Sequence, residues 1–211
     1  MKRGSAVRAR QLPLLPPSLE LEAGAARRRK TRWILQPKLR SSPAVAWCKR
    51  WLDGFDLGQL DWVRIDSGRG GYEGAYGRCW FPEGEKAYRI SCQVPGPFPN
   101  PQRIYLRPVY RRPDGSWEPR PKGVRVSQHW ASAEGREWLS VYRKILLDDR
   151  DEAIVWMIGH EAFHFLRRTR QVAGRNVEWQ ADAYACELLE RWRQEQDQDA
   201  APPSQRGRTL R

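Results

Sequence analysis

The pattern of apolar and polar residues divides the chain into a first part of short strands and a last part of helices. Leu60 to Ile65 alternates apolar and polar residues, which is the period of a strand with one buried face. Further strands are expected at 76–81, 87–94, 102–111 and 137–147. The turn-forming Pro82-Glu83-Gly84-Glu85 lies between two of these runs and predicts a hairpin.

Two longer helices are expected after the last strand. Residues 153–168 contain no proline, follow the acidic run 148–152 and end in two arginines. Acids suit the start of a helix and bases its end, because the helix dipole is positive at the start. The next helix is expected to begin with Asn176 as its N-cap and to end near Arg193. A shorter helix is expected at 44–52. Strands followed by two main helices indicate an α+β fold with a small antiparallel or mixed sheet.

The remaining segments are expected to be irregular. Residues 95–101 hold three prolines and one glycine and predict a loop, and residues 112–136 predict a long polar surface connection. Residues 1–43 lack apolar periodicity and indicate a disordered basic N-terminal tail, and residues 194–211 indicate a disordered C-terminal tail. A single domain is therefore expected at 44–193.

The formal net charge of +13 is concentrated in the first segment. Residues 1–40 carry eleven Lys or Arg against two acids, whereas residues 41–193 carry twenty-four against twenty, a net of +4. A run such as Arg27-Arg28-Arg29-Lys30 can hold phosphates without reading a base sequence, so a non-specific nucleic-acid contact through this tail is one interpretation. A solvated tail with no dedicated partner is the other.

The cysteines and the apolar runs indicate an intracellular protein. The four cysteines at 48, 79, 92 and 186 form no C-x-x-C pair, which excludes a zinc ribbon and argues against a disulfide framework. No apolar stretch is long enough to cross a bilayer, and Pro13 interrupts the only leucine-rich run near the N-terminus. We therefore expect no signal peptide, no membrane partner, and a cytoplasmic location with reduced thiols.

The first of the two main helices contains the motif His160-Glu161-Ala162-Phe163-His164. Residues four apart lie on one face of a helix, so both imidazoles can reach one metal ion. Glu161 follows the first histidine and lies within reach of a metal-bound water, which predicts a catalytic base.

A catalytic zinc needs a third protein ligand and one open position. The only other histidine, His129, lies upstream in a segment expected to be irregular. Glu178 and Asp182 lie four apart on one face of the second helix and both fit; we assign Glu178 as the ligand. Asp182 is then expected to accept the free N–H of a zinc-bound imidazole and to fix its orientation. The expected cofactor is Zn²⁺, although two imidazoles and a carboxylate also suit iron or manganese.

The motif and the segment Glu178-Trp179-Gln180-Ala181-Asp182-Ala183-Tyr184-Ala185 together resemble a known class of enzymes. The pattern H-E-x-x-H with a later E-x-x-x-D is similar to that of the gluzincins, and more narrowly to the ImmA/IrrE-like metallopeptidases. The resemblance covers residues 137–193 at most. It implies a zincin-like fold and a protein substrate cleaved internally. SprT-like proteases are a second resemblance, but their usual third ligand is a histidine, and none follows His164.

The predicted function is zinc-dependent hydrolysis of peptide bonds, with Glu161 moving the proton. Strand 137–147 is expected to pair with an extended substrate. Tyr184 is a candidate oxyanion stabiliser, and so are Arg167 and Arg175 near the helix ends.

Two alternatives remain open at this point. One is a catalytically silent zincin-fold protein that is tethered to nucleic acid by its basic tail. The other is a structural metal site, for which Cys186 is the extra ligand to consider; packing in the core is the favoured interpretation of that residue.

Overall fold

The computed structural model describes residues 30–68, 75–82 and 87–200. Their elements, in chain order, are β1 (Arg32–Leu35), the 3₁₀ helix η1 (Pro37–Leu39), α1 (Pro43–Leu52), β2 (Leu60–Asp66), β3 (Tyr76–Trp80), β4 (Tyr88–Gln93), β5 (Asn100–Tyr110), β6 (Arg125–Ala131), β7 (Glu137–Leu147), α2 (Arg150–Arg168) and α3 (Glu178–Ala200). This order confirms the expected α+β class, with strands preceding the two long helices.

Four strands form a mixed sheet in the order β1-β2-β4-β3. β1, β2 and β4 are parallel, whereas β3 runs antiparallel to β4 as the predicted hairpin requires. Side chains on β4 alternate between buried and half-buried, so one face of this sheet enters the core. Among the described strands, β3 is at the edge of this sheet, with β4 as its one neighbour.

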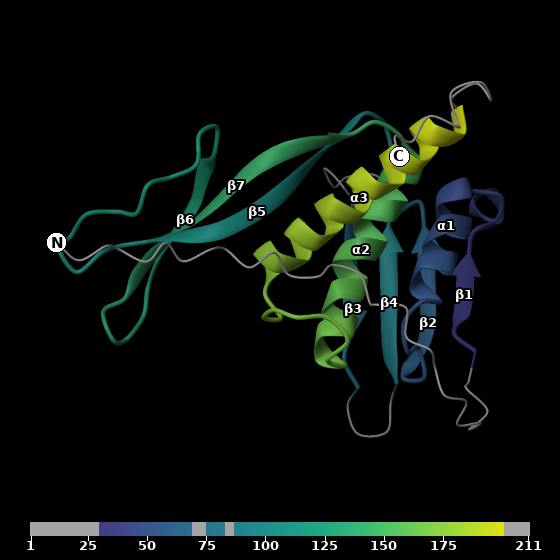
Figure 1. Ribbon diagram of the computed structural model, residues 1–211, viewed down its shortest axis with the longest axis horizontal. Coiled ribbons are helices and arrows are strands. Elements are labelled where there is room, and N and C mark those ends of the chain that lie inside the picture. Colours follow the sequence, from purple (N-terminus) through teal and green to yellow (C-terminus); the bar gives the residue numbers. More distant parts are fainter. Residues whose placement is uncertain (1–29, 69–74, 83–86, 201–211) are drawn as a thin grey trace, which may run out of the picture.

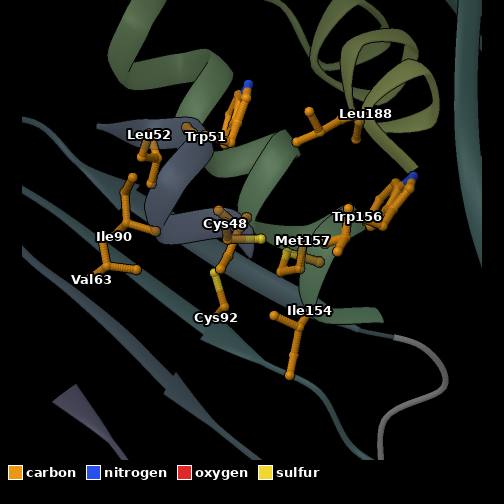
Figure 2. Packing of buried hydrophobic residues seen from close by; sticks show 14 of the residues in the cluster. Cys48, Trp51, Leu52, Val63, Ile90, Cys92, Ile154, Trp156, Met157 and Leu188 are labelled. Carbon is orange, nitrogen blue, oxygen red and sulfur yellow. The ribbon is translucent and has the colours of Figure 1, made fainter. Parts of the chain in front are cut away.

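The core lies between this sheet and the helices. α2 contacts β3, β4 and α1, and nearly every residue from Glu152 to Leu166 is buried. Figure 2 shows Ile154 and Met157 of α2 beside Cys48 of α1 and Cys92 of β4. The four cysteines are free thiols, as expected, and the three at 48, 79 and 92 are buried. A helix that is packed on most sides has little freedom to move, so the side chains that α2 presents are held in fixed positions.

α3 packs against the remaining side of α2 at a close approach. A Cβ at Gly159 would lie 2.9 Å from Leu188 Cδ2 and 3.2 Å from the backbone of Ala185. The lack of a side chain at Gly159 therefore lets the two helices meet one residue before His160. This contact sets how near α3 comes to the histidines.

The other three strands form an antiparallel sheet in the order β5-β7-β6, which we call the arm and define as residues 100–147. In Figure 1 the arm extends away from the helices and the four-stranded sheet, and only its base lies beside α3. At that base Ile104 and Leu147 are buried, and Ile145 packs against the core. Every residue of β6 is exposed.

Several expected boundaries are wrong. Asn100 and Pro101 belong to β5 because they pair with Leu147 and Leu146, although they fall in the expected loop. The expected irregular connection 112–136 contains β6, which is paired to β7 along its length. β1 and the start of α1 lie inside the expected N-terminal tail; pairing of β1 with β2 supplies stability that four residues alone do not signal.

The C-terminal helix also differs from expectation at both ends. α3 begins at Glu178, so Asn176 is not its N-cap, and it continues to Ala200, which removes residues 194–200 from the expected disordered tail. Residues 1–29 and 201–211 of the two expected tails lie outside the described residues. Among the helices that are described, none combines the length and the apolar character needed to cross a membrane.

Candidate metal centre

The helix that carries the motif begins at a side-chain cap. Asp149 accepts a hydrogen bond from the Glu152 amide at 2.9 Å, and Asp151 and Glu152 occupy the first turn. The predicted acidic start is therefore confirmed, and the helix begins at Arg150 rather than at Ala153. From there the helical repeat places His160 and His164 on the same face.

The three predicted ligands meet at one point. The Nε2 atoms of His160 and His164 are 3.3 Å apart, and each lies near a carboxylate oxygen of Glu178, at 3.2 Å and 3.6 Å respectively. Ligands bound at about 2.0–2.1 Å from a tetrahedral zinc are about 3.3 Å from one another. The observed spacings therefore fit a single tetrahedral ion held by two imidazoles and one carboxylate, with one position left open.

Hydrogen bonds on the far side of each ring orient both imidazoles. His160 Nδ1 lies 2.8 Å from Asp182 Oδ1, and His164 Nδ1 lies 2.8 Å from Asn176 Oδ1. With Nδ1–H donating to these oxygens, Nε2 is in each ring the nitrogen left to bind a metal at the shared point. The structure thus brings Asp182 to its predicted place. The role of Asn176 was missed, because its position just before a helix was interpreted as a cap.

Asp182 also connects the site to the arm. Its second oxygen accepts a hydrogen bond from the Tyr105 amide of β5 at 2.6 Å, and the residue is 3% exposed. One carboxylate therefore fixes both the ring of His160 and the base of the arm. Few acids are buried among the described residues, because a buried carboxylate needs hydrogen-bond partners. The two partners of Asp182 therefore restrict how β5 and α2 are positioned relative to α3.

The charges in the site favour a cation between the ligands. Burial alone would lower the pKa of His160, but the hydrogen bonds to Asp182 and Glu178 raise it to about 10. The hydrogen bond with His160 holds the pKa of Glu178 below its usual value. Burial lowers the pKa of His164. A proton on His160 thus supplies positive charge beside the carboxylates of Glu178 and Asp182. A metal ion between the ligands would supply positive charge at the same place.

Glu161 lies on the sheet side of the centre, against the edge strand β3. It is 4% exposed, and burial raises its pKa to about 7. A Cβ at Gly77 would lie 2.7 Å from both Cγ and Oε1 of Glu161 and 2.7 Å from Met157 Sδ. Gly77 therefore leaves the space that Glu161 occupies, which was not predicted from the sequence.

These groups line a cleft of about 410 Å³. Its walls come from β3, the start of β5, α2, the loop before α3, and the first turns of α3. Glu178 is 68% exposed and lies at the mouth, whereas His160 and His164 are about a tenth exposed. The cleft cations are Arg78 and Arg103, neither of which was predicted. A buried donor set that opens to solvent on one side is the usual form of a catalytic metal site.

The predicted oxyanion stabilisers are not in the cleft. Tyr184 packs against Trp51 and Phe163 and is 7% exposed, because it lies two residues after Asp182 and so on the opposite face of α3. Arg167 donates to the Gly174 carbonyl, and the Arg175 amide donates to Gln180. None of the three lines the cleft, so their position gives this predicted role no support.

Two other sequence predictions are settled by position in the fold. β7 (137–147) is the central strand of the arm, so both of its edges are already paired and it has none free for a substrate. Cys186 is half-buried against the core and outside the group of ligand atoms, which confirms its interpretation as a packing residue. His129 lies on β6, where it is hydrogen-bonded to Glu137.

Comparison of the chain with protein-family models, with curated proteins and with solved structures finds no match, so the chemistry of this centre has to be argued from its own geometry.

Proposed function

We propose that the protein is a zinc-dependent metalloendopeptidase whose ligands are His160, His164 and Glu178 and whose general base is Glu161. The observation that carries the proposal is the cluster of ligand atoms beside an acid that is 4% exposed: the two Nε2 atoms are 3.3 Å apart, and they lie 3.2 Å and 3.6 Å from the two carboxylate oxygens of Glu178. Zincin-like architecture and kinship with the ImmA/IrrE-like family are part of the proposal. The motif helix, followed by a helix that supplies the carboxylate, supports both.

Peptide hydrolysis needs an activated water and a proton carrier. When bound, zinc lowers the pKa of a coordinated water toward about 7 and polarises a carbonyl. Glu161, held against β3, takes the proton of the attacking water and returns it to the leaving nitrogen. Burial suits this role, because a carboxylate whose pKa is raised to about 7 is a stronger base than an exposed one. Asp182 and Asn176 hold the two imidazoles in position throughout.

The edge strand β3 supplies the surface for an extended substrate. Ala75 to Cys79 line the cleft, and the outer edge of this strand has no partner strand among the described residues. A peptide added along this edge would run past the ligands with its backbone hydrogen-bonded. β3 thus takes the role that the sequence had given to 137–147. Arg78 and Arg103 replace Tyr184 as candidates for stabilising negative charge on the scissile carbonyl.

The test is cleavage of an unfolded protein such as reduced, alkylated casein, with zinc present. The parent is expected to give fragments, and the Glu161→Gln variant is expected to give none while retaining the metal. Glu187→Gln is the matched control, because Glu187 is an exposed acid on α3 away from the cleft. A Glu161→Gln protein that still cleaves would overturn the assigned base.

The alternative of a catalytically silent protein keeps the metal and loses only the turnover. It predicts zinc in the parent without cleavage of any unfolded protein. Its proposed tether lies mostly in residues 1–29, outside the described residues. An intracellular location also stays a prediction.

A further inference from the structure

The positive charge of the central part of the chain lies in the arm. Residues 100–147 carry ten Lys or Arg against four acids, a net charge of +6, whereas residues 41–99 and 148–193 together carry fourteen against sixteen. The arm is therefore the basic part of the region that folds around the metal centre. Counted over the whole range 41–193, the net charge is only +4, which hides the concentration of positive charge in the arm.

The register of the arm sorts its side chains onto two unlike faces. Cross-strand partners share a face, and residues two apart along β7 share it too. One face of β7 therefore carries Trp138, Ser140, Tyr142 and Lys144. The residues that pair with these four on β5 and β6 lie on the same face. We call this the basic aromatic face and define it as Arg103, Tyr105, Tyr110, Arg125, Gln128, Trp130, Trp138, Ser140, Tyr142 and Lys144.

The composition of this face is unusual for a solvated sheet. Five of its members are aromatic, three are cationic and none is acidic. The opposite face of β7 carries Leu139, Val141 and Ile145 with Glu137 and Arg143, and includes the buried Val141. Because a β-sheet needs only one apolar face to pack, the rings of the basic aromatic face are not explained by the core of the arm.

The rings and cations of this face are accessible and arranged side by side. Trp130 is 43% and Tyr110 39% exposed, and Trp130 stacks on Trp138 with 15° between the ring planes. The Arg103 guanidinium lies 5.1 Å from the Tyr142 ring centre. Arg125 and Lys144 are exposed and form no ion pair with any described residue. Two of the four acids of the arm are instead paired elsewhere, Glu118 with Arg107 and Glu137 with Arg111.

We propose that the basic aromatic face of the arm binds single-stranded nucleic acid. Exposed rings stack on unpaired bases, and interleaved cations neutralise the phosphates that join them, so the two kinds of side chain are satisfied together. A duplex keeps its bases stacked on one another, so it offers these rings no free base face. An acidic polypeptide would satisfy the cations and leave the rings without partners, so it fits this surface less well.

The face continues to the metal centre. Tyr105 and Trp130 line a hollow that also includes Glu178 and Trp179, and Arg103 and Tyr105 line the metal cleft itself. A strand bound along the arm therefore ends beside the mouth of that cleft. The binding does not depend on the proposed peptidase activity, because no side chain of the face is a proposed metal ligand and only Arg103 has a proposed role in cleavage.

The test is binding of the full chain to a labelled oligothymidylate of about 20 nucleotides, followed by fluorescence anisotropy at two salt concentrations. The parent is expected to bind it more tightly than a duplex of the same length. Trp130→Ala and Lys144→Ala are each expected to weaken binding, Trp130→Ala by about tenfold or more. Arg143→Ala is the matched control, because Arg143 lies next to Lys144 on β7 and is exposed on the opposite face.

The N-terminal basic residues are present in all four proteins, so the comparison isolates the arm. Unchanged binding in Trp130→Ala and Lys144→Ala would overturn the proposal and assign any binding to another part of the chain. Equal weakening by Arg143→Ala would overturn it too, because net charge alone would then explain the effect. Binding of poly-glutamate in preference to the oligothymidylate would replace the nucleic acid with an acidic polypeptide. Cleavage of casein is measured on the same preparation of the parent, so failure of the peptidase proposal would be seen separately from failure of the binding proposal.

Discussion

The metal centre holds its two histidines nearly buried and hydrogen-bonded, whereas the arm exposes polar and aromatic side chains to solvent. His160 and His164 are each oriented by a hydrogen bond and enclosed by two helices and an edge strand. Arg125 and Lys144 are held only by their backbone positions in the sheet, and Trp130 adds a hydrogen bond to Ser140 and stacking on Trp138. The first arrangement fixes the positions of a few atoms, and the second presents a surface of given chemistry. A single substitution in the metal centre should therefore cause a large loss of activity or of metal binding. A single substitution in the arm should cause only a partial loss of binding.

The largest effect is expected from Glu161→Gln. Loss of a general base typically slows a reaction by about 10²–10⁴-fold, and the amide keeps the shape of the side chain against Gly77. Metal content should stay at the level of the parent because Glu161 is not among the three ligands. Cleavage rate and metal content are measured on the same preparation; a loss of both would mean that Glu161 holds the metal.

Asp182→Asn is expected to weaken zinc binding by about 10–100-fold without removing a ligand. The amide oxygen can accept from only one of the two donors, His160 Nδ1–H and the Tyr105 amide, whereas each carboxylate oxygen accepts from one of them. Competition with a chromophoric chelator measures the affinity. Asn176→Ala, which frees His164 Nδ1 instead, is the companion variant, and an affinity equal to that of the parent in both would contradict the orienting role.

Gly77→Ala is expected to destabilise the fold by about 1–3 kcal/mol, because its methyl group would overlap Glu161 and Met157 in a packed region. Denaturant unfolding measures this difference. The control is Gly58→Ala, where the nearest atom is the end of the flexible Asp56 side chain at 3.2 Å. Equal losses in the two variants would indicate a general cost of replacing glycine rather than the close approach of Glu161 to β3.

Glu152→Gln tests the ion pair that joins the start of α2 to α3. Arg193 Nε donates to Glu152 Oε1 at 2.6 Å, and the Asp148 amide donates to Glu152 Oε2 at 2.7 Å. Burial alone would raise the pKa of Glu152, but these hydrogen bonds hold it below its usual value. The variant is expected to lose about 1 kcal/mol near neutral pH, since Arg193 is partly exposed and solvent weakens the pair.

The pH dependence of this effect has a defined sign. A carboxyl group with a lowered pKa in the folded state stabilises the protein above its unfolded pKa, and this contribution is lost as pH falls through the folded value. The difference between parent and Glu152→Gln in urea unfolding should therefore shrink below about pH 4. A difference that grows on acidification would show that the charged form is not the stabilising one.

The smallest effect is expected from Lys144→Ala. This exposed side chain has no ion pair among the described residues, so unfolding should change by less than about 0.5 kcal/mol, and zinc content should not change. A large loss of stability would show that Lys144 makes contacts that stabilise the fold, contrary to its exposed position.

The sequence was most informative where the residue spacing itself determines the geometry. Two histidines four apart on a helix must share a face, and Glu178 and Asp182 behave in the same way on the next helix. The strand at 137–147 and the hairpin 76–94 were likewise predicted, because their apolar patterns and turns are local signals.

The rest depends on contacts between distant segments. Nothing local in Gly77 indicates that Glu161 fills the space beside it, and Asn176 carries the same sequence signal as a helix cap. Tyr184 was assigned by its nearness in sequence to Asp182, but a separation of two residues turns it into the core. β6 was missed because it is exposed throughout, so its sequence has no alternation of apolar and polar positions to reveal it.

The central claim is tested most directly by measuring bound metal per chain by mass spectrometry after purification without chelators, in the parent, in Glu178→Ala and in Glu190→Ala. Glu190 is an exposed acid on the same helix and serves as the matched control. The account predicts about one zinc per chain in the parent and in Glu190→Ala, and its loss or marked weakening in Glu178→Ala. Absence of metal from the parent, or zinc retained equally in Glu178→Ala, would contradict the three-ligand centre.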